Sequence, residues 1–191
     1  MKKLLLILFL LPLITLAQRD SVYLKTDIFT SVYSELLQQP KWVKYTVQCP
    51  NGKASRAGMD FYAEPNLITS DNNDYVGNVW DKGHCAPAAD FSCTKELLYK
   101  TFTYANCVLQ HERLNRGVWR MLESYERGLA VTTTVNIEIR MVYSAASLKL
   151  NTGATVPDGF YKIITFGEKT EKYYFPNKIP DHSDFKKYLI Q

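Results

Sequence analysis

The sequence predicts one α+β domain built around a mostly antiparallel sheet flanked by helices, and three observations favour this fold class. Several segments alternate apolar and polar residues and are separated by turn residues, which is typical of antiparallel strands. One longer segment repeats apolar residues at helical spacing. The 191 residues contain no internal repeat, linker or low-complexity stretch, so we expect one core.

The first seventeen residues have the order of a secretory signal peptide. Lys2 and Lys3 precede an apolar run that ends near Ala17. A membrane anchor is the alternative, but about thirteen apolar residues interrupted by Pro12 are short for a span that needs roughly 20. We therefore expect a signal peptide over 1–17, a domain over 18–191, and a periplasmic or extracellular mature form without membrane contact.

The charge balance gives only a weak preference for polyanions. Removing Lys2 and Lys3 lowers the formal net charge from +4 to +2. Attraction to nucleic acid must therefore come from local clusters of cations rather than from the whole chain.

Four cysteines lie beyond the predicted cleavage site, at Cys49, Cys85, Cys93 and Cys107. In an exported protein they allow up to two disulfides among three pairings, and small buried thiols are the alternative for each. A zinc site is disfavoured because neither C-x-x-C nor H-x-x-x-H spacing occurs.

In the N-terminal half, the spacing predicts a helix from Asp27 to about Leu37 that ends before Pro40. The alternating stretch 42–48 predicts a strand, which the Asn-Gly turn in "CPNGK" follows. The stretch 70–75, "SDNNDY", is a calcium loop or a solvated loop leading into a strand near Val79. The solvated loop is favoured, because the glycine and distal glutamate of an EF-hand are missing.

The C-terminal half predicts the remaining elements of the sheet and its helices. In chain order they are a helix capped by Thr94 up to Tyr99, a strand over 101–109, a helix over 114–129, a strand over 135–144, a Pro-Asp-Gly turn at 157–159, strands over 160–166 and 172–176, and a short helix over 184–189.

The helix over 114–129 carries an apolar stripe and a polar side. The stripe, which we assign to the core, consists of Leu114, Val118, Met121, Leu122, Tyr125 and Leu129. The polar side holds Arg116, Arg120, Glu123 and Arg127, with Asn115 at the border. Asn115 and Glu123 are two turns and about 12 Å of rise apart on one side of the helix, so their side chains can converge on one substrate.

These residue types suit chemistry on phosphates. A neutral imidazole such as that of His84 accepts a proton from water near pH 7, and an asparagine side-chain oxygen suits Mg²⁺. Arginines and lysines hold phosphates. The ordinary alternatives are a structural histidine, a solvated face for Arg116, Arg120 and Arg127, and an i+4 pair of Glu123 with Arg127. Periodicity alone leaves both interpretations open.

The stretch "DKGHCAPAAD", residues 81–90, resembles the D-R-G-H-x-A-P-A signature of the DNA/RNA non-specific endonucleases, which are ββα-metal (His-Me finger) nucleases. Four further stretches follow the order of that family: "QPKWVKY", "TFTYANCVLQ", "LNRGVWRMLE" and "VPDGFYK". The resemblance covers roughly residues 33–177 and is much more specific than one short motif.

The resemblance implies a role for each matching residue. His84 matches the general base, and Asn115 matches the only direct protein ligand of the catalytic Mg²⁺, for which Mn²⁺ is a potential substitute. Glu123 matches the glutamate that orders the waters around that ion. Arg127 matches an arginine that contacts phosphate, and Asn106 matches a supporting asparagine.

Backbone phosphates are the expected contacts of the cationic residues. We predict phosphate contacts for Lys82 and Arg127, and also for Arg116, Arg120 and Arg56. Such contacts carry no direct information about the base sequence. Asp81 is expected to orient a neighbouring cation or backbone amide.

The sequence also departs from the family pattern. Lys82 stands where arginine is usual and lacks its bidentate fork. "ANCVLQ" replaces S-N-x-x-P-Q. Cys85 and Cys107 replace apolar residues, which suggests a bridge between the two. The chain ends at Gln191, so the resemblance implies a shortened or absent C-terminal helix.

The resulting hypothesis is an exported Mg²⁺-dependent endonuclease that cleaves DNA and RNA and leaves 5′-phosphates. The alternative is an exported nucleic-acid-binding protein that keeps the fold without catalysis, and a third interpretation is a disulfide-stapled structural domain. The hypothesis allows a homodimer, and the sequence does not identify a protein inhibitor.

Overall fold

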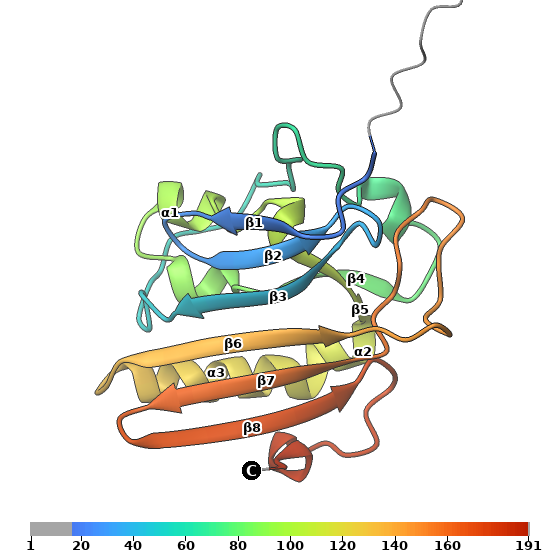
Figure 1. Cartoon of the computed structure of the whole chain (residues 1–191). Coiled ribbons are helices and arrows are strands. Elements are labelled where there is room, and N and C mark those ends of the chain that lie inside the picture. The colour runs from blue at the N-terminus through green and yellow to red at the C-terminus, as the bar shows by residue number, and fades with distance from the viewer. Residues whose placement is uncertain (1–16, 191) are drawn as a thin grey trace, which may run out of the picture.

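The computed structural model describes residues 17–190, and its central element is a six-stranded sheet in the order β1-β2-β3-β6-β7-β8 (Figure 1). All neighbouring strands of this sheet are antiparallel. The strands are β1 (Val22–Lys25), β2 (Thr30–Ser34), β3 (Gln39–Thr46), β6 (Val135–Val142), β7 (Gly159–Phe166) and β8 (Lys169–Pro176).

A smaller antiparallel pair, β4 (Trp80–His84) and β5 (Cys107–His111), lies beside this sheet and leads directly into a helical segment. The α-helices are α1 (Lys95–Tyr99), α2 (Glu112–Leu114) and α3 (Arg120–Ala130). Short 3-10 turns cover 72–75, 88–91, 104–106 and 185–188.

One face of the large sheet packs on the core together with α3, which runs behind β6 and β7 in Figure 1. Strand β6 alternates buried and more exposed residues along its length, which a sheet with one solvated face requires. Ile137 and Ile139 of β6 lie in the same core as Leu122 of α3. The predicted α+β architecture with a mostly antiparallel sheet is confirmed.

Most of the expected elements form where alternation or capping predicted them. The stretches 42–48, 135–144, 160–166 and 172–176 contribute to β3, β6, β7 and β8. Thr94 caps α1, because its hydroxyl accepts a hydrogen bond from the Leu97 amide at 3.1 Å. The strand expected over 101–109 is shorter, since 104–106 forms a turn before β5 begins.

The helix predicted over 27–37 is wrong, because this stretch contains the turn that follows β1, the strand β2 and the beginning of the next turn. The Thr26 hydroxyl accepts from the amides of Ile28 and Phe29, and these bonds fix a tight turn in place of a first helical turn. Pro40 ends no helix. It lies in β3 beside a register shift of β2, a place where a strand tolerates a missing amide donor.

The helix predicted over 114–129 is interrupted. Residues 115–119 form a wide turn between α2 and α3 in which Gly117 has the non-helical angles φ −99° and ψ −118°. Leu122 is buried, as predicted, and Glu126 is buried on the same helix. Met121, predicted to be buried, is 45% exposed.

The stretch 70–75 is a capped turn. Asp74 is buried, and its carboxylate accepts from the Asp71 amide and from the Thr152 hydroxyl. Asp71 in turn accepts from the Asn73 amide. These carboxylates therefore stabilise the polypeptide itself, and the solvated loop predicted here is a more ordered element than expected.

None of the helices within residues 17–190 is long and apolar enough to cross a membrane. The predicted signal peptide over 1–17 lies outside the described residues, apart from Ala17.

Candidate active site

A cavity of ≈ 920 Å³ opens beside the β4-β5 pair and the start of α3. All eight residues predicted to act on the substrate or metal line this cavity, although they come from segments far apart in the chain. They are Arg56, Lys82, His84, Asn115, Arg116, Arg120, Glu123 and Arg127.

His84 is the last residue of β4, and its ring packs against two aromatic rings that also contact each other. The centroids of Phe61 and Phe102 each lie 4.8 Å from the His84 centroid. Its Nε2 is shielded from solvent and meets no hydrogen-bond partner among residues 17–190. Burial, reinforced by the nearby Arg56 cation, lowers the pKa of His84 to about 3. The imidazole is therefore neutral near pH 7.

Asn115 begins the interrupted segment after α2, and Asp81 of β4 fixes its side chain. The Asn115 Nδ2 donates to Asp81 Oδ2 at 2.9 Å. Because the amide nitrogen is used in this way, the amide oxygen is the atom that Asn115 can offer to a ligand. Asp81 thus connects the strand that carries His84 to the helical segment that carries Asn115.

Asp81 also holds Arg116, as expected for an acid that orients a neighbouring cation. The Arg116 Nε donates to Asp81 Oδ2 at 2.8 Å, and its Nη1 lies 3.5 Å from Glu112 Oε2. The Arg116 side chain is 67% exposed, so it reaches solvent from this anchored position. Arg56 and Arg120 are exposed and form no ion pair within the described part of the chain.

Lys82 brings a cation to the cavity wall from the middle of β4. Its ammonium donates to the side-chain oxygen of Asn72 and lies 3.4 Å from a carboxylate oxygen of Asp60. It also lies 5.2 Å from the centroid of the Phe61 ring. The same ring therefore contacts both the histidine and the neighbouring cation.

Arg127 is anchored by a residue to which the sequence assigned no role. Its Nη1 donates to Asp90 Oδ1 at 3.0 Å, and the Asp90 side chain is fully buried. The i+4 pair of Arg127 with Glu123, which was the ordinary alternative to a functional role, is not found among the described residues, and Arg127 pairs with Asp90 instead. Glu123 lines the cavity, and burial raises its pKa to about 7, although the Lys162 and Arg127 cations oppose this rise.

A buried ion pair lies on the core side of α3. The Lys162 Nζ of β7 is 2.9 Å from Glu126 Oε1 and 4.4 Å from the centroid of the Trp119 ring, and both charged side chains are fully buried. Sequence reasoning missed this pair. A signal existed, because Lys162 stands at an inward position of an alternating strand, between Phe160 and Ile164.

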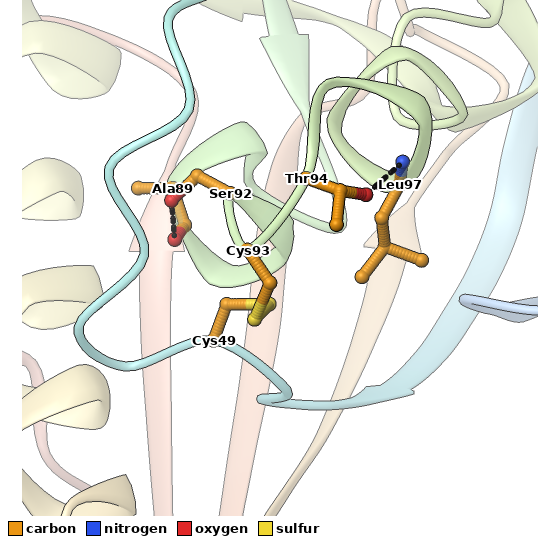
Figure 2. Close-up of a disulfide and its surroundings, with 6 residues drawn as sticks. All are labelled: Cys49, Ala89, Ser92, Cys93, Thr94 and Leu97. Atoms are coloured by element: carbon orange, nitrogen blue, oxygen red, sulfur yellow. Dashed lines mark hydrogen bonds between the residues drawn. A yellow bond between two sulfur atoms is a disulfide. The ribbon is translucent and has the colours of Figure 1, made fainter.

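The disulfide joins Cys49 to Cys93, as Figure 2 shows, and the suggested bridge between Cys85 and Cys107 is wrong. Both of those thiols are free and buried. Cys107 pairs with His84 across the β4-β5 ladder, whereas Cys85 lies one residue beyond the end of β4.

This disulfide anchors the segment that closes the cavity beside His84. The Ala54 amide donates to the Ser92 carbonyl at 2.8 Å, and a Cβ on Gly52 would lie 2.5 Å from the Ser92 carbonyl carbon. Only glycine permits this approach. The anchored segment continues to Arg56 and Phe61 in the cavity wall.

We expect Cys49→Ser with Cys93→Ser to lower the free energy of unfolding by about 4 kcal/mol, because the disulfide closes a loop with a sequence separation of 44. Urea denaturation of both proteins measures this difference. Adding a reductant should destabilise the original chain and leave the double variant unchanged. Equal stability of the two oxidised proteins would contradict the anchoring role.

The fold and site together define a ββα-metal nuclease architecture: two antiparallel strands with His84 at the end of the first, followed by a helical segment over 112–130 that carries Asn115. The crystal structure of the EndoG/EndoGI complex contains a chain with the same fold. The two chains match with a TM-score of 0.76 at 22% identity, over 88% of this chain and 80% of that chain.

The DNA/RNA non-specific endonuclease family matches residues 14–191, and the chain belongs to that family. Mitochondrial nuclease EXOG of Danio rerio is 33% identical over 102 residues, which are 51% of this chain and 30% of that protein. Nuclease C1 of Cunninghamella echinulata var. echinulata is 30% identical over 121 residues, 57% of this chain and 48% of that protein. The matches therefore span less than half the length of these relatives.

Proposed function

We propose that this chain is an exported, Mg²⁺-dependent endonuclease that hydrolyses phosphodiester bonds in DNA and RNA. One observation carries the proposal: a single cavity brings together a neutral histidine, an oriented asparagine amide and five cationic side chains. The names of the relatives, which are nucleases, support the same activity.

In this mechanism His84 acts as the general base. Its neutral ring accepts a proton from a water molecule while the water oxygen bonds to phosphorus in line with the departing 3′ oxygen. The bond from phosphorus to that 3′ oxygen breaks, which leaves a 5′-phosphate on one product. Phe61 and Phe102 hold the ring in place, so little rotational freedom is lost when substrate binds.

The residues present fit a Mg²⁺ ion held mainly by water and substrate. Asn115 offers its amide oxygen because Asp81 occupies its amide nitrogen, and Glu123 lines the same cavity. Residues 17–190 contain no group of three or more His, Cys, Asp or Glu side chains that could hold a metal. Magnesium keeps several waters in protein sites, and Mn²⁺ suits the same donors. When bound, Mg²⁺ would neutralise charge on the phosphate and on the leaving oxygen.

The cationic side chains bind the nucleic-acid backbone in this proposal. Lys82 and Arg127 sit deep on the cavity wall and are held by acids, whereas Arg56, Arg116 and Arg120 extend towards solvent. Contacts to phosphates read no base directly, so sequence specificity is low. Affinity should fall steeply as salt rises.

The disulfide supports export. A bond between Cys49 and Cys93 persists in oxidising compartments, such as a periplasm or the extracellular medium, and is rare in a reducing cytosol. We propose that the mature chain begins near Gln18 and acts in such a compartment.

A plasmid-nicking assay tests the function. The chain should convert supercoiled DNA to nicked and linear forms with Mg²⁺ and should stop when a chelator is added. It should also degrade single-stranded DNA and RNA. Binding of the plasmid without nicking at any Mg²⁺ or Mn²⁺ concentration would favour an inactive nucleic-acid-binding protein instead.

The pH dependence of cleavage follows from the lowered pKa of His84. The base is active when neutral, so the acidic limb of kcat/KM should lie well below pH 6.5, the pKa of an unperturbed histidine. Arg56→Gln removes a cation that helps to lower this pKa, and the limb should move to higher pH. Arg120→Gln, which changes another exposed arginine of the cavity, is the matched control. An acidic limb that stays in place in both variants would contradict the role of Arg56.

A further inference from the structure

The second face of the six-stranded sheet, which points away from α3 and the cavity, carries an unusual set of side chains. The β register aligns one row of them across all six strands: Tyr23, Val32, Trp42, Arg140, Tyr161 and Tyr174. Neighbouring strands lie about 4.8 Å apart, so the row extends for about 24 Å. Four of its six members are aromatic, although the row does not belong to the core.

The aromatic side chains of this row are accessible. Tyr23 is 62% exposed, and Trp42, Tyr161 and Tyr174 are half-buried. Their rings lie next to one another in pairs: the Tyr161 and Tyr174 centroids are 4.9 Å apart, and those of Tyr23 and Trp42 are 6.3 Å apart. Each half of the sheet thus presents a pair of rings, and Arg140 stands between the pairs, on β6.

A second row, two residues further along each strand, supplies positive charge. The register aligns Lys25, Thr30, Lys44, Glu138, Ile163 and Lys172. Together with Arg140 of the first row, the two rows hold four cations and one carboxylate. That carboxylate is already paired, because Glu138 accepts from Arg140 Nε at 2.5 Å and lies 3.3 Å from Lys44 Nζ.

The cations and the rings are interleaved. Lys44 Nζ lies 5.3 Å from the centroid of Trp42, and Lys172 Nζ lies 4.9 Å from the centroid of Tyr161. A sheet face with bases stacked on exposed aromatic side chains, and with cations beside them for the phosphates, is a general solution for binding single-stranded nucleic acid.

We propose that this sheet face, defined by the two rows above, binds single-stranded nucleic acid. A duplex suits it less well, because the bases of a duplex are stacked on each other and cannot lie on Trp42 or Tyr161. A second copy of the chain is a poorer occupant, because a symmetric contact would bring the same cations of both copies together. The ligand class rests on the proposed nuclease function, but the surface is separate from the catalytic cavity.

The consequence is a second contact for single-stranded substrates. A strand held on the sheet face stays with the enzyme after one cut, which raises its effective concentration at the cavity. The sheet face should therefore lower KM for long single strands and leave kcat unchanged. Duplex plasmid should be cleaved at the same rate with or without it.

Fluorescence anisotropy with a labelled oligothymidylate of about 16 nucleotides measures the binding. The measurement uses the His84→Ala variant in the presence of a chelator, so that the oligonucleotide is not cleaved. Adding Tyr161→Leu and Tyr174→Leu should weaken binding by about 5- to 150-fold for each stacked base lost. The matched control is Tyr99→Leu, since Tyr99 is 46% exposed on α1 and belongs to neither row of the sheet face. Equal affinity in the sheet variant and the control would overturn the proposal.

Photocrosslinking keeps the test valid if the double variant folds poorly. The unchanged chain is irradiated with an oligonucleotide that contains 5-bromouracil, and crosslinked peptides are identified by mass spectrometry. Crosslinks to Trp42, Tyr161 or Tyr174 are expected. Crosslinks confined to the cavity, or a stable dimer that Arg140→Glu dissociates, would assign the face to another role and overturn the proposal.

The two proposals fail in different ways. Binding and crosslinking at the sheet face without plasmid cleavage would refute the nuclease and leave the sheet face intact. Mg²⁺-dependent cleavage of plasmid, with no difference between the sheet variant and the Tyr99→Leu control on long single strands, would refute binding at the sheet face and leave the proposed nuclease function intact.

Discussion

The His84→Ala variant should cleave plasmid DNA about 10² to 10⁴ times more slowly than the unchanged chain, the range for a lost general base. The ring of His84 packs against Phe61 and Phe102, and its pKa of about 3 keeps it neutral and able to accept a proton near pH 7. The loss should appear in kcat, because the imidazole accepts its proton in the transition state. Cleavage rates at saturating plasmid measure it.

His111→Ala is the matched control for this variant. His111 is half-buried at the end of β5 and does not line the cavity. Its Nδ1 accepts from the Arg113 amide at 3.1 Å, so its role is to cap α2. A modest loss of stability with nearly full activity is expected for His111→Ala. If both histidine variants lost activity equally, the effect of His84→Ala would reflect general damage to the fold.

The Asn115→Ala variant should abolish cleavage or raise the Mg²⁺ concentration needed for half-maximal activity by about tenfold or more, the size typical of changes around bound metals. Asp81 directs the Asn115 amide, and the substitution removes the only oxygen that this side chain can offer to the ion. A Mg²⁺ titration of the cleavage rate measures the change.

Two further variants separate a metal role from a structural one. Asp81→Asn keeps the shape of the residue but weakens its hold on Asn115 and Arg116, so the Mg²⁺ requirement should rise less than in Asn115→Ala. Asn151→Ala changes an exposed asparagine in a turn outside the cavity and should leave the titration unchanged. An unchanged titration in Asn115→Ala would contradict its role as a ligand.

Local sequence patterns predicted most of the sheet, because its strands alternate between a buried and a solvated face. Ile137 and Ile139 of β6 are buried while Asn136 and Arg140 are exposed. This alternation of apolar and polar residues can be recognised in the amino-acid sequence alone. The same reasoning failed at 27–37. There the side-chain cap of Thr26 and the pairing with β3 decide the conformation, and neither leaves a periodic signal.

The candidate site could be predicted as a set of residues but not as an arrangement. The motif around His84 and the polar side of the later helix supplied every predicted residue now found in the cavity except Arg56. The residues that hold these side chains in place could not be predicted. Asp90 holds Arg127 across 37 positions of the chain, and no local pattern reveals such a long-range pair.

The aromatic rings around His84 show the same limit. Phe61 and Phe102 come from two separate segments that meet only in the folded chain, one of them anchored by the Cys49–Cys93 disulfide. Sequence alone left three disulfide pairings open and suggested a wrong one. In the β4-β5 register Cys107 faces His84 rather than Cys85, and no local sequence pattern reveals this pairing.

The central claim is that His84 and Asn115 serve one reaction in one cavity, and a double-mutant cycle tests it most directly. Single-turnover cleavage rates are measured for the unchanged chain, His84→Ala, Asn115→Ala and the double variant. Residues that act as a unit lose their effects together, so the double variant should be about as slow as the slower single variant. Losses that multiply, as for two independent sites, would contradict the claim.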